Sequence, residues 1–228
     1  MLSGIQSVRF RHLLKHQGAL LVLIFVICLT FLLQVILGAP FYFDLMIFPA
    51  DVTREWEALV AGEMEKVSLS EFGTLLSSVM LHGGIAHLFG NMIFLWIFAS
   101  LTAELIGQKW MLLTFVLTGI AGSICHVAMN PEEVAPCLGA SGAVSGFQGI
   151  YLAMAVRWRL PDPHFWPLAR PISPTILVGL AIVFVGMDFI GHTRGELGTA
   201  YGAHFGGFVA GLILGAFAVR MPRAALPR

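Results

Sequence analysis

Long apolar runs without charged residues alternate with short polar connections along most of this chain. The first run carries no charge from Gln17 to Phe43, which exceeds the roughly 20 residues that a membrane-spanning helix needs. Five further apolar runs follow. We expect six spans, at about residues 18–38, 83–103, 108–128, 138–156, 172–190 and 200–219. Because backbone groups that face lipid must be hydrogen-bonded within their own segment, these runs are predicted to be helices.

The segment between the first two runs breaks this pattern. It contains Pro40, Pro49 and six acidic residues between Asp51 and Glu71, and its apolar residues are too interrupted for a span. We expect a structured outer loop in which an amphipathic element around Trp56 lies at the membrane interface. The predicted fold class is all-α, a polytopic membrane bundle of six transmembrane helices with this loop between spans one and two.

Basic residues give the bundle a predicted orientation. Of the 13 Lys and Arg residues, only Arg54, Lys66 and Arg194 fall outside when both termini are placed inside, which leaves ten in the inner segments. Such an excess is typical of cytoplasmic loops. We therefore divide the chain into three regions: a cytoplasmic N-terminal segment (1–17), a membrane domain (18–219) and a cytoplasmic tail (220–228).

Composition supports a lipid environment. The chain is 57% hydrophobic and 11% charged, whereas soluble domains carry about 25% charged residues. The formal net charge is zero, so no basic excess favours a nucleic-acid partner. Cys28, Cys125 and Cys137 match no metal-binding spacing and are expected to be packed free thiols, although Cys125 and Cys137 could approach each other at one membrane face.

Polar residues gather at the start of spans two, four and six. His82, His87 and Asn91 open span two, Ser141 opens span four, and His204 opens span six. In the predicted orientation all three spans enter from the outer face, so these residues share about the same depth. Polar side chains in lipid cost free energy without partners, which favours a functional role for the set.

Small residues surround Ser141 and His204. They are Gly139, Gly142 and Ser145 in span four and Gly207 in span six. Such residues let two helix backbones approach closely. The hydroxyl of Ser141 is therefore expected to reach the imidazole of His204.

This pair suits acyl transfer. A serine hydroxyl is a weak nucleophile until a base takes its proton, and histidine can take it and return it to the leaving amine. The oxyanion also needs hydrogen-bond donors. His87 and Asn91 lie one helical turn apart, and the backbone N–H of Ser141 lies at a helix N-terminus, so these three are candidate donors.

Together these motifs resemble the rhomboid intramembrane serine proteases in their six-span form, over about residues 18–219. The matching motifs are His82-(four)-His87-(three)-Asn91, Gly139-Ala140-Ser141-Gly142 and Ala203-His204-(two)-Gly207-(three)-Gly211. The resemblance implies a Ser141–His204 dyad without an aspartate. It also implies an oxyanion site made by His87, Asn91 and the Ser141 N–H, with His82 supporting the outer loop.

Two features depart from the family pattern. Many members carry a Trp-Arg pair in the outer loop, where this chain has Glu-Phe-Gly at 71–73. Many also carry an aromatic residue four positions after the serine, where this chain has Ser145, so His204 is expected to be held differently and the level of activity stays open. Glu104 with Gly107 resembles a family glutamate at the inner end of span two, with a structural role.

Other assignments of these polar residues are weaker. His82, His87 and His204 could form a zinc site, but signatures such as H-E-x-x-H are absent, and we expect neither metal nor cofactor. Asp188 could complete a triad, which the family's dyad does not need. The other histidines of interest are expected to be packed or exposed: His126, His164 and His192. A channel or transporter would need ionisable residues at mid-membrane depth, and the spans carry few.

The predicted function is hydrolysis of peptide bonds in or near the transmembrane helices of other membrane proteins. The resemblance implies single-span substrates, and the lipid bilayer is the other expected partner; the oligomeric state stays open. We expect an integral multi-pass protein of the bacterial inner membrane, with the site opening to the outer face, or else of an internal eukaryotic membrane. The alternative is a catalytically weak or inactive rhomboid-like protein that binds membrane helices.

Overall fold

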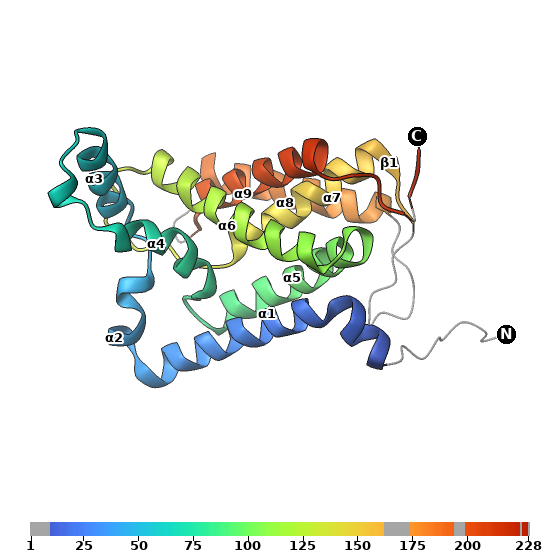
Figure 1. Cartoon of the computed structure of the whole chain (residues 1–228), viewed down its shortest axis with the longest axis horizontal. Coiled ribbons are helices and arrows are strands. Elements are labelled where there is room, and N and C mark those ends of the chain that lie inside the picture. Colours follow the sequence, from blue (N-terminus) through green and yellow to red (C-terminus); the bar gives the residue numbers. More distant parts are fainter. Residues whose placement is uncertain (1–9, 162–173, 194–198, 224, 228) are drawn as a thin grey trace.

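Six long helices dominate the structure, a computed structural model that describes residues 10–161, 174–193, 199–223 and 225–227 (Figure 1). The long helices are α1 (Phe10–Leu37), α5 (Ile85–Ile106), α6 (Gln108–Met129), α7 (Ser141–Arg157), α8 (Pro174–Thr193) and α9 (Tyr201–Ile213), which a π-helical turn (Leu214–Ala218) continues. Each overlaps one predicted span. The all-α fold class is confirmed.

The predicted outer loop is built from short helices. They are α2 (Ala39–Tyr42), α3 (Pro49–Val60) and α4 (Leu69–Ser77), with 3₁₀ turns at Phe43–Leu45, Met64–Lys66 and Ser78–Met80. In Figure 1 these helices lie at one end of the long helices. At the other end, the two-residue strand β1 (Trp158–Arg159) pairs antiparallel with β2 (Leu226–Pro227).

Helix α7 lies at the centre of the bundle. Every residue from Gly142 to Tyr151 is buried, and α5, α6, α8 and α9 all pack against this helix. The side chains of Phe147 and Ile150 join the main core cluster, which also includes Leu95 and Phe98 of α5. A helix that is enclosed on all sides needs small residues wherever a neighbour's backbone comes close.

Glycines make the contact between α7 and α9. A Cβ atom built on Gly207 would overlap the carbonyl oxygen of Gly142, and one on Gly211 would overlap that of Gly146. The Gly149 position is closed in the same way by the carbonyl oxygen of Phe208. The predicted close approach of the two helix backbones is therefore observed.

The start of α7 differs from that of the predicted fourth span. The fourth span was expected from residue 138, but α7 begins at Ser141 because Gly139 has φ +133°, a backbone conformation that no α-helix contains. The predicted start of the fifth span, at 172, lies outside the described residues, and α8 is described from Pro174.

Within the described residues, four helices are long and apolar enough to cross a membrane: His16–Leu37, Ile85–Ile106, Gln108–Met129 and Tyr201–Ala218. Helix α7 has 17 residues, and the apolar stretch of α8, Thr175–Phe184, is also shorter. The count of six spans therefore stays a prediction. Large apolar side chains such as Phe25 and Phe217 are exposed on the outside of the bundle, as expected for contact with lipid.

The outer loop is ordered by its own contacts and by the connection to α7. The carboxylate of Glu55 accepts a hydrogen bond from the backbone N–H of Ser68 at 2.6 Å. Ile47 exchanges two backbone hydrogen bonds with Cys137, at 2.8 and 3.1 Å. Trp56 is 57% exposed, and its predicted position at the membrane interface stays a prediction.

Candidate active site

The start of α5 brings two of the predicted histidines together. The imidazole rings of His82 and His87 have centroids 5.2 Å apart and meet edge to face. His82 is only 2% exposed. Burial, and then the neighbouring imidazole of His87, lowers the pKa of His82 to about 4, so its ring is neutral at neutral pH.

His87 and Asn91 face the segment that precedes Ser141. A Cβ atom built on Gly139 would lie 2.7 Å from Cε1 and 2.9 Å from Nε2 of His87, and 3.8 Å from Nδ2 of Asn91. The backbone N–H of Gly139 donates to the carbonyl oxygen of Ser78 at 3.0 Å. The outer loop therefore holds Gly139 against both candidate oxyanion donors.

Ser141 is the first residue of α7 and is partly exposed. Backbone N–H groups in the first turn of a helix have no partner within that helix. Helix α7 has no side-chain cap at Ala140, so its N-terminal N–H groups are suited to receive a developing negative charge.

The residues beside Ser141 and His204 are in contact. A Cβ atom on Gly142 would lie 3.1 Å from the carbonyl oxygen of Ala203, and one on Gly122 of α6 would lie 2.6 Å from the same oxygen. His204 is partly exposed and is close enough to His87 for the two imidazoles to interact electrostatically. A hydrogen bond between Ser141 and His204 stays a prediction.

Ser145 is buried in α7, one turn below Ser141. Ser145 occupies the position at which many family members carry an aromatic residue. Its contact with His204 also stays a prediction.

The structure adds two residues that sequence reasoning missed or left undefined. Gln34 of α1 is 6% exposed and makes two hydrogen bonds with the backbone of His82. A lone glutamine in the first apolar run was the available signal. His126 is packed, as one of the expected alternatives had it: it is buried, its Nε2 lies 3.8 Å from the carboxylate of Glu133, and its backbone contacts Gly202 of α9.

The end of α5 and the start of α6 are hydrogen-bonded to α1. The side-chain N–H of Gln17 donates to the carboxylate of Glu104 at 2.7 Å, and the carboxamide oxygen of Gln108 accepts from the backbone N–H of Ala19 at 2.6 Å. These contacts lie at the opposite end of the helices from the candidate site, which supports a structural role for Glu104.

No group of three or more His, Cys, Asp and Glu side chains is placed to hold a metal ion among the described residues. The three cysteines are free, and burial raises the pKa of the Cys137 thiol to about 12, which keeps it protonated. The side chains of three residues considered above lie outside the described part of the chain: Asp188, His164 and His192.

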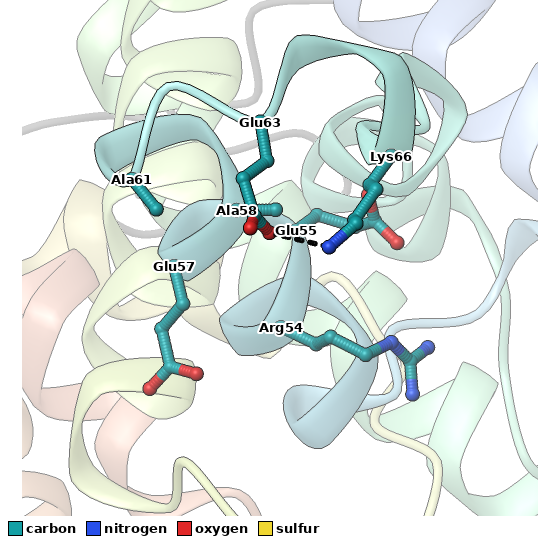
Figure 2. Close-up of a pocket in the computed structure, with 7 residues that line it drawn as sticks. All are labelled: Arg54, Glu55, Glu57, Ala58, Ala61, Glu63 and Lys66. Carbon is teal, nitrogen blue, oxygen red and sulfur yellow. Dashed lines mark hydrogen bonds and ion pairs between the residues drawn. The ribbon is translucent and has the colours of Figure 1, made fainter.

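A hollow of about 330 Å³ lies in the outer loop, between α3 and the turn that follows it (Figure 2). Its lining residues are Arg54, Glu55, Glu57, Ala58, Ala61, Glu63 and Lys66. Glu63 and Lys66 form an ion pair across it at 3.0 Å. None of the predicted site residues lines this hollow, and its charged groups of both signs offer no nucleophile.

Comparison with known proteins shows the family of this chain. A family model described as the Rhomboid domain matches residues 69–221. The chain is 31% identical to the rhomboid protease GluP of Bacillus subtilis over 172 residues, which are 75% of this chain and 31% of the relative. It is 32% identical to the putative rhomboid protease YdcA of the same organism over 108 residues, 47% of this chain and 54% of the relative.

Similarity also extends to a relative named as inactive. The chain is 29% identical to inactive rhomboid protein 1 of Drosophila melanogaster over 126 residues, 54% of this chain and 9% of the relative. The alignments span between about a tenth and about half of the length of these three relatives. With the rhomboid domain matched over residues 69–221, this chain belongs to the rhomboid family of multi-pass membrane proteins.

Proposed function

We propose that this protein is an intramembrane serine protease that hydrolyses peptide bonds in or near the transmembrane helices of other membrane proteins. One observation carries the proposal. The polar starts of α5, α7 and α9 converge, because Gly139 packs against His87 and Asn91 while Gly142 packs against Ala203. Membership of a family that contains proteases supports it.

In the proposed mechanism, Ser141 is the nucleophile and His204 is the general base and acid. His204 takes the hydroxyl proton as the Ser141 oxygen attacks the substrate carbonyl carbon. It then gives this proton to the leaving amine as the C–N bond breaks, which leaves an acyl-enzyme. In the second half of the reaction a water molecule attacks the acyl carbon as His204 takes its proton. The ester bond to Ser141 then breaks, His204 returns the proton to the Ser141 oxygen, and the new carboxyl end of the substrate leaves.

The negative charge on the substrate oxygen is held by donors that converge from two helices. We assign this role to the side chains of His87 and Asn91 and to the backbone N–H of Ser141. The contact of Gly139 with both side chains supports the assignment. Removing one such donor typically lowers the rate by about 10²–10³-fold.

Substrates are proposed to be single-span membrane proteins whose helix unwinds locally to expose a carbonyl group to Ser141. The proposed location is the bacterial inner membrane, with both termini in the cytoplasm and the site opening to the outer face. The excess of Lys and Arg in the inner segments supports this orientation.

The second candidate is a rhomboid-like protein that binds membrane helices without cleaving them. Similarity to a relative named as inactive, and Ser145 in place of an aromatic residue, favour this candidate. Both Ser141 and His204 are present, which favours the protease.

A serine-reactive fluorophosphonate probe separates the two candidates. We expect the probe to label the wild-type protein in detergent, and we expect Ser141→Ala and His204→Ala to abolish both labelling and cleavage of a single-span reporter protein. Ser77→Ala is a matched control, because the Ser77 hydroxyl donates to the carbonyl oxygen of Leu45 within the outer loop. Labelling that persists in Ser141→Ala, or a wild type that neither labels nor cleaves, would contradict the protease.

A further inference from the structure

We infer that Gln34 of α1 is a positioning residue for the oxyanion site: its side-chain carboxamide holds the backbone of His82, and the ring of His82 in turn sets the orientation of His87. The inference rests on the proposed function, because it assigns to Gln34 a role in the same reaction. It adds a residue from α1, a helix that contributes no other group to the proposed site.

The contact between Gln34 and His82 uses both ends of the carboxamide. The side-chain N–H of Gln34 donates to the carbonyl oxygen of His82 at 3.3 Å, and the backbone N–H of His82 donates to Oε1 of Gln34 at 3.0 Å. Gln34 is 6% exposed, and it lies in a part of α1 that carries no charged residue. A buried carboxamide costs free energy unless it is hydrogen-bonded. Here its nitrogen and its oxygen are both hydrogen-bonded to the backbone of His82.

The backbone around His82 is irregular. His82 lies between the 3₁₀ turn Ser78–Met80 and the start of α5, where the chain is neither helix nor strand. Gly83 and Gly84 follow it, and a Cβ atom on Gly84 would meet no atom within 4 Å. Glycine restricts the backbone least of all residues, so the paired hydrogen bonds from Gln34 define where His82 stands.

The ring of His82 in turn contacts the ring of His87. The two rings meet edge to face with centroids 5.2 Å apart. His87 is exposed to a large extent, and its ring lies against His82 and against Gly139. The lowered pKa of His82 keeps its ring neutral, so it packs against His87 without adding a positive charge beside the donor.

Displacement of an oxyanion donor should lower kcat more than it raises KM, because the oxyanion forms only after the nucleophile has attacked. Gln34→Met removes both hydrogen bonds at nearly constant volume. We expect it to lower kcat about tenfold, less than the 10²–10³-fold that removal of a whole donor costs, with KM within about twofold of wild type. Thr30→Val is the matched control, because Thr30 lies one turn away on α1 and donates to its own helix at Val26.

A double-mutant cycle distinguishes positioning from general stabilisation. If Gln34 acts through His87, Gln34→Met changes kcat little once His87→Ala has already removed the donor. Reporter cleavage by purified full-length variants is measured well below their unfolding temperatures. The inference would be overturned if Gln34→Met lowered kcat by the same factor in the wild-type and His87→Ala backgrounds, or if the single variant kept the wild-type kcat. In either case, cleavage by the wild type would still support the proposed protease.

A second variant covers the case in which Gln34→Met does not fold. Gln34→Glu keeps an acceptor for the His82 N–H and loses the donor to its carbonyl oxygen. We expect a kcat between those of the wild type and His87→Ala, and a wild-type kcat would overturn the inference. A wild type that is neither labelled by fluorophosphonate nor able to cleave would overturn the proposed function and this inference together.

Discussion

The backbone of Gly207 on α9 lies directly against the carbonyl oxygen of Gly142 on α7. Ser141 precedes one of these residues, and His204 precedes the other by three positions. The distance between the two helices at the proposed dyad is therefore set by the absence of two side chains. Any Cβ atom at this contact must push α9 away from α7.

Replacement of Gly207 by alanine is expected to separate the proposed dyad. The added methyl group would overlap the Gly142 carbonyl oxygen, and a misplacement of about 1 Å at a catalytic pair can cost on the order of 10²-fold in rate. We expect kcat to fall by that order and the thermal midpoint to fall as well, measured by reporter cleavage and by unfolding in detergent. Gly179→Ala on α8 is the control, because its Cβ atom would meet nothing within 4 Å; equal effects of the two variants would contradict the prediction.

Gly139→Ala tests the contact between the outer loop and the oxyanion donors. Gly139 has φ +133°, and its Cβ atom would lie 2.7 Å from the ring of His87. We expect kcat to fall by about 10²–10³-fold, as when a donor is lost. Gly62→Ala controls for backbone strain, because Gly62 has φ +79° and open space around its Cβ position. The steady-state rates of both variants on one reporter are the measurement, and a comparable drop in Gly62→Ala would attribute the loss to strain alone.

His82 predicts a pH dependence of stability. Its pKa is lowered from 6.5 to about 4 in the folded protein, so the unfolded chain binds more protons between these values and stability falls as pH falls through that window. Below about pH 4 both states are protonated and the loss is complete. The shift corresponds to a loss on the order of 3 kcal/mol.

The measurement is the thermal midpoint of the purified protein between pH 7.5 and pH 4. His82→Phe keeps an aromatic ring beside His87 and cannot be protonated, so its midpoint should decline less over the same range. An identical decline in the two proteins would show that other groups cause the acid sensitivity.

Arg157 is expected to hold the end of α7 against the π-helical turn that continues α9. Its guanidinium donates to the carbonyl oxygens of Gly215 and Val219 at 2.5 and 3.0 Å and lies 4.0 Å from the ring centre of Trp158. Because hydrogen bonds from charged groups contribute about 1.5–3 kcal/mol, Arg157→Gln should lower the thermal midpoint clearly. Arg159 is exposed, so the control variant Arg159→Gln should change the thermal midpoint little. Reporter cleavage at low temperature should be retained in both, and a selective loss of kcat in Arg157→Gln would point to a role in the site instead.

The helices and the polar starts of three spans could be predicted from the chain alone. Apolar runs of membrane length demand internal hydrogen bonding, and that requirement is local. The same is true of glycine: Gly142 and Gly207 favoured close helix contact, and the structure contains that contact. The start of α7 at Ser141 was predicted three residues early, because an apolar pattern does not reveal the positive φ of Gly139.

What the sequence determined by itself is the set of apolar segments, their helical character and the positions of Ser141, His87 and His204 near the starts of helices, because each depends on neighbours within one helix. Only the tertiary structure decided that Gln34 pairs with the backbone of His82 and that Gly139 rests on His87. These contacts join residues that are about 50 positions apart in the chain. Their existence depends on how helices pack and turn about their axes, a property that no local pattern specifies.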